Sequence, residues 1–241
     1  MFRLSQVLLS ILLPAIAAAQ DYVVVDLGVI GDGPSEARGI NNAGEVTGFS
    51  QTGELAPPFD FPVRRGFVWL PAPAYGLTAG LTDLGTVATL PLRSSIANDI
   101  SDAGLIAGSS ENGGTTQFGD PIRVPFTAVG DVLDPLPLPA FISFSADARA
   151  VNGRGEIAVS ESLGFGCRDY LWLPAAAYGL DAGYYRLPRL DGLNEGSAFD
   201  INDRGQVVGF KTGACDALGG GNPAFLWLPE PAYGLGAGIH D

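Results

Sequence analysis

Short apolar runs alternate with turn-forming residues along almost the whole chain. β-Branched and aromatic residues fill these runs, as in Val46 to Ser50 and Phe67 to Trp69, and Gly, Pro, Asn and Asp separate them. This spacing is typical of β-strands joined by tight turns, and helix-forming segments are scarce after the N-terminal apolar run. The pattern therefore predicts an all-β protein.

One strand-and-turn element occurs four times along the chain. It reads ARGINNAG, ANDISDAG, ARAVNGRG and AFDINDRG, and its closing glycines are Gly44, Gly104, Gly155 and Gly205, at steps of 60, 51 and 50 residues. The first repeat carries a longer insertion around Gln51 to Val63. Asn and Asp side chains bond the nearby backbone, and Gly tolerates positive φ, so each element predicts a tight hairpin. Self-similarity at this period indicates a repeat architecture.

Each repeat divides into four strand-sized pieces. The first piece ends at Ile40, Ile100, Val151 or Ile201, and the second begins at Val46, Ile106, Ile157 or Val207, which we expect to face the core. The third piece is Phe67–Trp69, Phe126–Ala128, Tyr170–Trp172 or Phe225–Trp227. Three copies of one phrase, WLPAPAYGLTAG, WLPAAAYGLDAG and WLPEPAYGLGAG, lead on to a fourth piece, which we expect to begin near Asp83-Leu84-Gly85 in the first repeat.

A segment that matches the fourth piece, Tyr22 to Gly28, stands alone near the N-terminus. If it pairs with the third strand of the last repeat, it seals a ring and removes exposed sheet edges. We therefore predict a single β-propeller-like domain over residues 20–241, with about four blades of four antiparallel strands. Its repeats span approximately 35–85, 95–138, 146–190 and 196–241, and 22–28 is the closing strand. An open β-solenoid is the alternative.

The repeated text resembles the HAF family of extracellular repeat proteins, which are exported bacterial proteins. The resemblance rests on Ala198 to Gly209, Ala224 to Trp227 and Asp26 to Gly28, and it extends over nearly all of the chain after the N-terminal run. Pro223 stands where the motif has its histidine. The resemblance implies export and repetition, and it implies no catalytic residues.

The N-terminus has the pattern of an export signal. Arg3 precedes an apolar run from Val7 to Ile16, and three alanines, Ala17 to Ala19, precede Gln20. The run is too short to cross a bilayer, so we expect removal of residues 1–19 and a secreted, periplasmic or extracellular protein with no membrane span. The formal net charge of −13, with Lys211 as the only lysine, disfavours nucleic acids and anionic membranes as partners. We expect a monomer.

The chain has two cysteines, Cys167 and Cys215. They occupy the same loop of two successive repeats, and an oxidising compartment would permit a disulfide between them. Two free thiols are the alternative. Two sulfurs without histidine partners do not form a zinc site.

Catalytic and metal-binding patterns are sparse. Asp99 and Asp200 hold related repeat positions and could form the paired carboxylates of a carbohydrate-active enzyme, or they could pair with arginines such as Arg38 and Arg149. His240 is the only histidine, which excludes a histidine-based metal site and disfavours a catalytic triad. The turns at Asn41-Asn42, Ser101-Asp102, Asn152-Gly153 and Asn202-Asp203 offer oxygens to calcium, although ordinary turn chemistry also explains them.

Three tyrosines recur in the long phrase, at Tyr75, Tyr178 and Tyr233. On one rim they could hold a sugar or an extended peptide, and the alternative is that each packs over its own blade. We predict a secreted, non-catalytic repeat domain without a cofactor, which binds an extracellular ligand, a glycan or a protein, or has a structural role. The alternatives are the carbohydrate-active enzyme and a calcium-assisted surface-binding module.

Overall fold

The computed structural model describes residues 23–57, 60–89, 93–116, 119–138, 145–162, 166–213 and 222–241. Every regular element in these residues is a β-strand, so the prediction of an all-β protein is confirmed. No helix in the described ranges is long and apolar enough to cross a membrane. The predicted export signal, residues 1–19, lies outside them.

Sixteen strands form four antiparallel sheets of four strands each, and we call each sheet a blade. Blade 1 contains β1 (Ser35–Ile40), β2 (Val46–Ala56), β3 (Phe61–Leu70) and β4 (Gly80–Gly85). Blade 2 contains β5 (Ser95–Ile100), β6 (Ile106–Thr115), β7 (Pro121–Val129) and β8 (Val132–Pro135). Blade 3 contains β9 (Ser145–Val151), β10 (Ile157–Ser162), β11 (Cys167–Leu173) and β12 (Gly183–Arg186). Blade 4 contains β13 (Glu195–Ile201), β14 (Val207–Thr212), β15 (Ala224–Leu228) and β16 (Gly238–His240).

The strands within each blade follow chain order from one edge of the sheet to the other. The first strands end and the second strands begin at the residues that the repeat predicts. Val46, Ile106, Ile157 and Val207 are all buried, as expected for residues that face the core. The fold is therefore propeller-like, with four blades of four antiparallel strands, as the repeat predicts.

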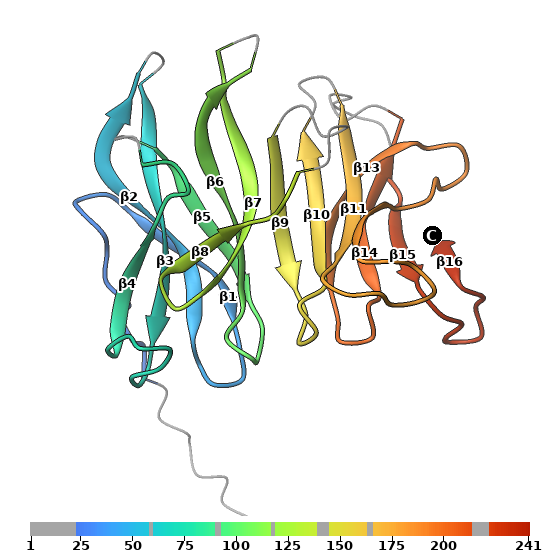
Figure 1. Ribbon diagram of the computed structural model, residues 1–241, viewed down its shortest axis with the longest axis horizontal. Helices are drawn as coiled ribbons and strands as arrows, with labels where there is room; N and C mark the ends of the chain where they lie inside the picture. The colour runs from blue at the N-terminus through green and yellow to red at the C-terminus, as the bar shows by residue number, and fades with distance from the viewer. Residues whose placement is uncertain are drawn as a thin grey trace, which may run out of the picture.

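The turn between the first two strands of a blade has the same geometry in each copy. In blade 1 the Gly44 amide donates to the Asn41 carbonyl at 3.0 Å, and Gly44 has φ 78°. The Asn41 side-chain oxygen accepts from the amides of Ala43 and Glu45, both at 3.0 Å. Asn152 and Asn202 make the same bonds in blades 3 and 4. We call the end of the molecule that carries these four turns the turn end, and the opposite end, with the β2–β3 and β6–β7 hairpins, the hairpin end (Figure 1).

The expected start of the fourth strand needs correction. In blade 1 the fourth strand begins at Gly80 and ends at Gly85, so Asp83 lies within it and does not begin it. The insertion after Gln51 lies where the sequence places it and lengthens the β2–β3 hairpin, where Leu55 pairs with Pro62 after a register shift. Apolar and aromatic residues in the insertion allow this extension of the ladder.

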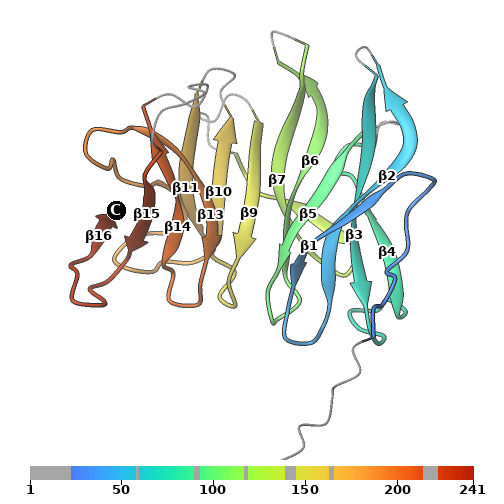
Figure 2. The same ribbon diagram turned by 180° about the vertical axis from the view of Figure 1, so that it is seen from behind.

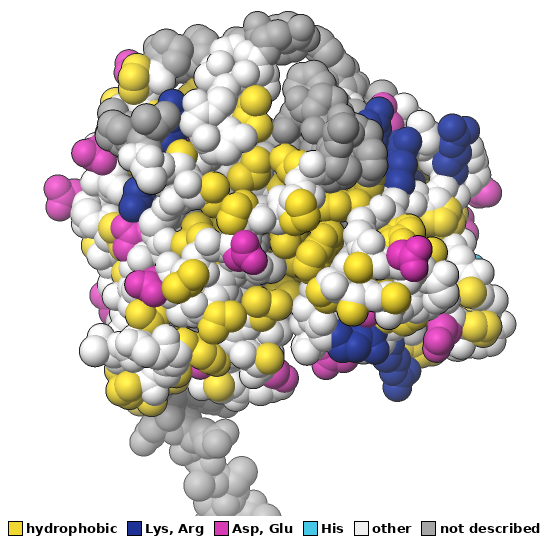
Figure 3. All heavy atoms as spheres, viewed as in Figure 1, with side chains coloured by type: hydrophobic (Ala, Val, Ile, Leu, Met, Phe, Trp, Pro, Cys, Tyr) yellow, Lys and Arg dark blue, Asp and Glu magenta, His cyan; other side chains and the backbone are white. Residues whose placement is uncertain are grey.

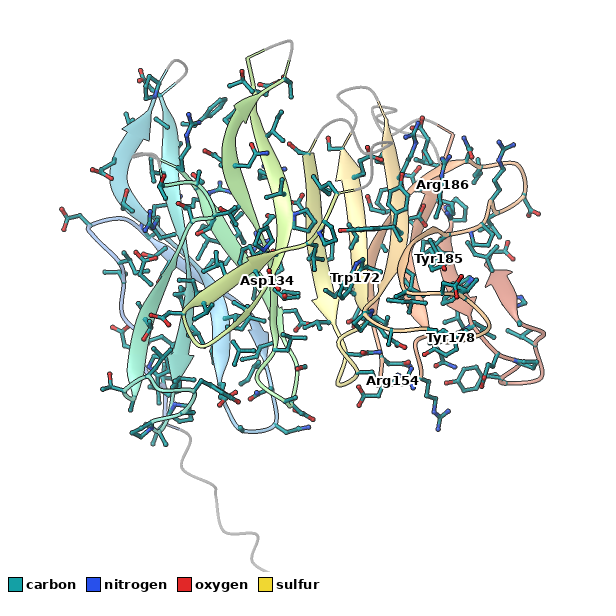
Figure 4. All side chains as sticks on the ribbon, in the orientation of Figure 1. Asp134, Arg154, Trp172, Tyr178, Tyr185 and Arg186 are labelled. Carbon is teal, nitrogen blue, oxygen red and sulfur yellow. The ribbon has the colours of Figure 1, made fainter. Side chains whose placement is uncertain are left out.

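The blades stand in chain order in an open row, with β1–β4 at one end and β13–β16 at the other (Figures 1 and 2). The first strands of successive blades contact one another along the row, because β5 packs against β1 and β9, and β9 packs against β13. In the described residues three apolar clusters fill the three junctions between successive blades. Figure 3 shows apolar side chains gathered over the middle of the viewed face, where Trp172 lies (Figure 4).

The predicted ring closure is wrong. The edge of β15 is already occupied by β16, which pairs Trp227 with Ile239 as β4 pairs Trp69 with Leu81. β16 reaches the edge of β15 because the repeated phrase WLPEPAYGLGAG, which leads from β15 to β16, belongs to the same repeat. Tyr22 lies outside the described residues, and the remainder of the expected closing strand, 23–28, forms no strand and lies beside blade 1 (Figures 1 and 2).

Candidate functional site

The three candidate tyrosines form identical tight hairpins at the turn end. Tyr75, Tyr178 and Tyr233 have φ of 54°, 56° and 56°, and each is followed by a glycine with φ between 75° and 79°. The flanking Ala and Leu pair across each hairpin, as in Ala74 and Leu77. Two successive positive φ values define a type I′ turn, which Asn-Gly favours and a bulky residue rarely enters. Local preference therefore does not explain a tyrosine at this place.

Contacts with the next blade explain two of the three tyrosines. A Cβ added to Gly104 of blade 2 would overlap the ring of Tyr75, and one added to Gly205 of blade 4 would overlap the ring of Tyr178. The hydroxyl of Tyr178 also donates to Glu156 at 3.1 Å, and its ring meets Trp227 edge-on with centroids 6.5 Å apart. Tyr178 and Arg154, which bond to each other, lie side by side at the turn end in Figure 4.

Exposure differs among the tyrosines. Tyr178 is half-buried, and Tyr75 is 40% exposed and Tyr233 66% exposed. Burial, followed by the hydrogen bond to Glu156 and the charge of that carboxylate, raises the pKa of Tyr178 to about 12. These tyrosines share one end of the molecule, and their role as a ligand rim stays a prediction.

The paired carboxylates lie on β5 and β13, and in the described residues neither forms an ion pair with Arg38 or Arg149, their expected partners. Asp99 accepts from the Val151 amide at 2.9 Å, and Asp200 accepts from the Ile201 amide at 2.8 Å. Arg38 bonds to Glu36, and Arg149 lies 3.9 Å from Asp147.

Burial raises the pKa of the Asp99 carboxyl. The amides of Val151 and Ile100 oppose this rise, and the charge of Asp200 adds to it. The two carboxylates are therefore electrostatically coupled, and a catalytic role for them stays a prediction.

The turn oxygens proposed for calcium bind protein groups. Both carboxylate oxygens of Asp102 accept from Asn42, at 2.8 and 2.7 Å, and Asp203 accepts from the Gly153 amide at 2.7 Å. These bonds join the turns of successive blades. No group of three or more His, Cys, Asp or Glu residues in the described ranges is arranged to hold a metal.

Cys167 begins β11 and is disulfide-bonded. The second cysteine of the chain, Cys215, lies outside the described residues. The pairing proposed from the sequence therefore stays a prediction.

A pocket of about 380 Å³ opens at the hairpin end, where blades 1, 2 and 3 meet. Such a volume is within the usual range of small-molecule sites, roughly 300–1,000 Å³. Its described lining comprises Phe61, Pro62, Arg64, Ser94, Ser95, Ile96, Ser109, Glu111, Thr116, Asp120, Pro121, Arg123, Ser145 and Ser162. The starts of β3, β5, β7 and β9 lie at the hairpin end and supply most of this lining, and β6 and the end of β10 supply Ser109, Glu111 and Ser162.

Several of the lining serines hold the blades together. The Gly66 amide donates to Ser95 Oγ at 2.9 Å, and the Arg123 amide donates to Ser145 Oγ at 3.0 Å, each across a blade junction. Ser109 differs from them, because it is only 1% exposed and its Oγ has no hydrogen-bond partner among the described residues. Glu111 Oε2 likewise lacks a hydrogen bond there and lies 3.7 Å from Arg93. A buried polar atom without a partner costs free energy, so its retention calls for an explanation.

Sequence reasoning missed this pocket entirely. Its residues come from three repeats, and the serines that line it occupy variable positions before and after the recognisable motif. One signal was available: Ser95 and Ser145 both begin a first strand, two or three residues before the repeated alanine. That signal indicates a blade contact and does not reveal a cavity.

No protein-family model matches this chain, and no curated protein matches it. Among solved structures the chain is similar to the β-propeller domain of the Trilobed protease from Pyrococcus furiosus, described as having an open velcro topology. The identity is 12%, the TM-score is 0.47, and the match covers 80% of this chain and 49% of that chain. The chain thus spans about half the length of the structure it matches. The resemblance to HAF repeats stays a prediction.

Proposed function

We propose that this chain is an exported, non-catalytic binding module whose hairpin-end pocket binds a glycan or a similar polyhydroxylated molecule. The observation that carries the proposal is the mixed lining of the pocket, in which charged side chains, among them Arg64, Arg123 and Asp120, lie beside the aromatic ring of Phe61. Such a lining can bond to the hydroxyls of a sugar and contact its apolar face.

The chemistry of the lining supports a sugar over an apolar ligand. Glu111 and Asp120 supply acceptors, Arg64 and Arg123 supply donors, and the serines can act as either. Phe61 lines the pocket and is 51% exposed, so its ring is accessible to the apolar face of a sugar. The net charge of −13 disfavours polyanions such as nucleic acids as ligands.

Replacement of Asp120 by asparagine separates binding from folding. We expect Asp120→Asn to leave the free energy of unfolding nearly unchanged, because the residue is exposed. We expect the same change to weaken glycan binding by about fivefold to tenfold, the equivalent of one hydrogen bond of about 1 kcal/mol. A glycan screen followed by titration calorimetry on the best ligand measures the affinity, and urea denaturation measures the stability.

A second pair of variants tests the aromatic contact. Phe61→Ala should weaken binding, whereas Leu55→Ala, at a residue in the same hairpin that is 54% exposed and is not among the pocket-lining residues, should not. Equal affinities for all three variants and the unaltered protein would place the ligand elsewhere. Failure of the full chain to bind any glycan would remove the proposal.

A further inference from the structure

The open row leaves one blade face without a partner at each end of the molecule. We call the side of blade 1 turned away from blade 2 the leading face, and the side of blade 4 turned away from blade 3 the trailing face. Because the repeats are equivalent, the three internal junctions show what each of these faces would contact. The comparison can be made position by position.

Apolar residues remain at both faces. Ile40 on the leading face is 70% exposed, whereas its equivalents Ile100, Val151 and Ile201 are 4, 4 and 5% exposed inside junctions. Val208 on the trailing face is 42% exposed, whereas its equivalents Thr47, Ala107 and Ala158 are all 0% exposed. Terminal repeats that end an array in solution normally carry a polar outer surface. At these two positions, however, the outer faces carry the apolar residues Ile40 and Val208.

The tyrosine contact is also left incomplete at each end. Tyr75 and Tyr178 each pack on the turn glycine of the following blade, Gly104 and Gly205. Tyr233 has the same strained φ and the same hydroxyl bond, to Gln206 at 3.0 Å, but no following blade. Gly44, the corresponding glycine of blade 1, has open space where a tyrosine ring covers Gly104 and Gly205, and a Cβ added there would have only Pro71 near, at 3.9 Å.

The polar contacts between successive blades are also incomplete at the two ends of the row. The side-chain amides of Asn41 and Asn152 each donate to the turn carbonyl of the following blade, at 3.0 Å. Asn202 is the matching donor on the trailing face, and the Asn41 carbonyl is the matching acceptor on the leading face. The carboxylate of Asp200 likewise corresponds to that of Asp99, which accepts from the Val151 amide, and Ile40 supplies the equivalent amide.

The trailing face therefore carries the groups of one side of a blade junction, and the leading face carries the complementary groups of the other side. The two faces lie at opposite ends of one molecule, so they cannot meet within it as it is folded (Figure 1). We propose that a second copy of this chain docks head to tail, with its leading face on the trailing face of the first. Such an interface is heterologous, so it forms a closed ring if the rotation closes and a filament if it does not. This proposal is an alternative to the monomer expected from the sequence.

Two charge-insertion variants test the proposal. Ile40→Glu blocks only the leading face, and Val208→Glu blocks only the trailing face. Both residues are exposed in the single molecule, so neither change should lower the melting temperature appreciably. At a junction each would bury an unpaired charge. Thermal denaturation confirms that both variants fold, and sedimentation velocity over the micromolar range measures association.

We expect the unaltered chain to form particles of two or more copies and each variant alone to be a monomer. An equimolar mixture of the two variants should form particles of two chains, because one variant keeps a trailing face and the other keeps a leading face. A monomeric unaltered chain throughout the range would overturn the proposal. So would continued association of either variant alone, or a mixture that stays monomeric.

Discussion

Tyr75, Tyr178 and Tyr233 adopt a left-handed backbone conformation that costs a bulky residue roughly 1–3 kcal/mol. Each is followed by a glycine, so an asparagine would suit the turn better. The ring of Tyr178 offsets this cost by packing on Gly205 and Trp227 of the following blade, whereas the ring of Tyr233 has no following blade. The same substitution should therefore have different effects at the two positions.

We expect Tyr178→Asn to lower the free energy of unfolding by about 2 kcal/mol, because the loss of aromatic packing outweighs the relief of backbone strain. We expect Tyr233→Asn to change it by no more than about 0.5 kcal/mol. Urea denaturation at low protein concentration measures both. Equal losses at the two positions would show that the tyrosine stabilises its own blade and not the junction.

Asp99 should make stability depend on pH. Burial raises its pKa in the folded state, so the native protein binds the proton more tightly than the unfolded chain does. The stabilisation from this proton is fully present below the unfolded pKa, near the ordinary value of 3.8, and is lost as the pH rises through the folded pKa.

We therefore expect Asp99→Asn to be more stable than the unaltered chain at pH 7, with the difference shrinking toward acid pH. Asp134→Asn, at an exposed position, makes the same charge change and serves as the control. Thermal denaturation from acid to neutral pH measures the difference. A neutral-pH stability of Asp99→Asn below that of the unaltered chain would contradict the assignment.

At the scale of strands, a buried ion pair joins β11 of blade 3 to β14 of blade 4. Lys211 Nζ lies 2.7 Å from Asp169 Oδ2, and the two side chains are 1% and 0% exposed. The Lys211 ammonium also lies over the ring of Phe225, 5.2 Å from its centroid. Burial lowers the pKa of Lys211 and raises that of Asp169, because both charges have been removed from water. Removal of one partner of such a pair lowers the free energy of unfolding more than replacement of both partners by apolar residues does.

We expect Lys211→Met to lower the free energy of unfolding by roughly 3–5 kcal/mol, because it leaves a buried carboxylate without its cation. The double variant Lys211→Met with Asp169→Leu should recover most of that loss, because neither charge is then buried. A double-mutant cycle in urea separates the two effects. A single variant within about 1 kcal/mol of the unaltered chain would show that water reaches Asp169.

The strands were largely predictable, and the pocket was not. Val46 and Ile201 mark strand boundaries because a hairpin is a local structure, whose asparagine and glycine act within a few residues. Arg64, Ser109 and Ser145 come from three different blades and meet only after those blades have packed together, and no local pattern records that geometry. The tyrosines were identified from their repetition, but their contacts with glycines of the next blade required the structure.

At the scale of the whole molecule, an open row of four blades has three junctions to stabilise it, whereas a ring of four would have four. If copies associate head to tail, each added junction stabilises the folded state by mass action. We expect the melting temperature of the unaltered chain to rise with protein concentration and that of Val208→Glu to stay constant. Differential scanning calorimetry at several concentrations checks this, and a constant melting temperature for both would argue against the association.

The sequence by itself determined the all-β class, the four repeats and the strand boundaries at the turn end, because these depend on interactions between residues close together in the chain. Only the tertiary structure decided that the row stays open. It also decided which segment pairs with the edge of β15, which the nearby β16 occupies in place of the distant N-terminal segment. The pocket and the two unpartnered faces were decided at the same level, because both are products of how whole blades pack.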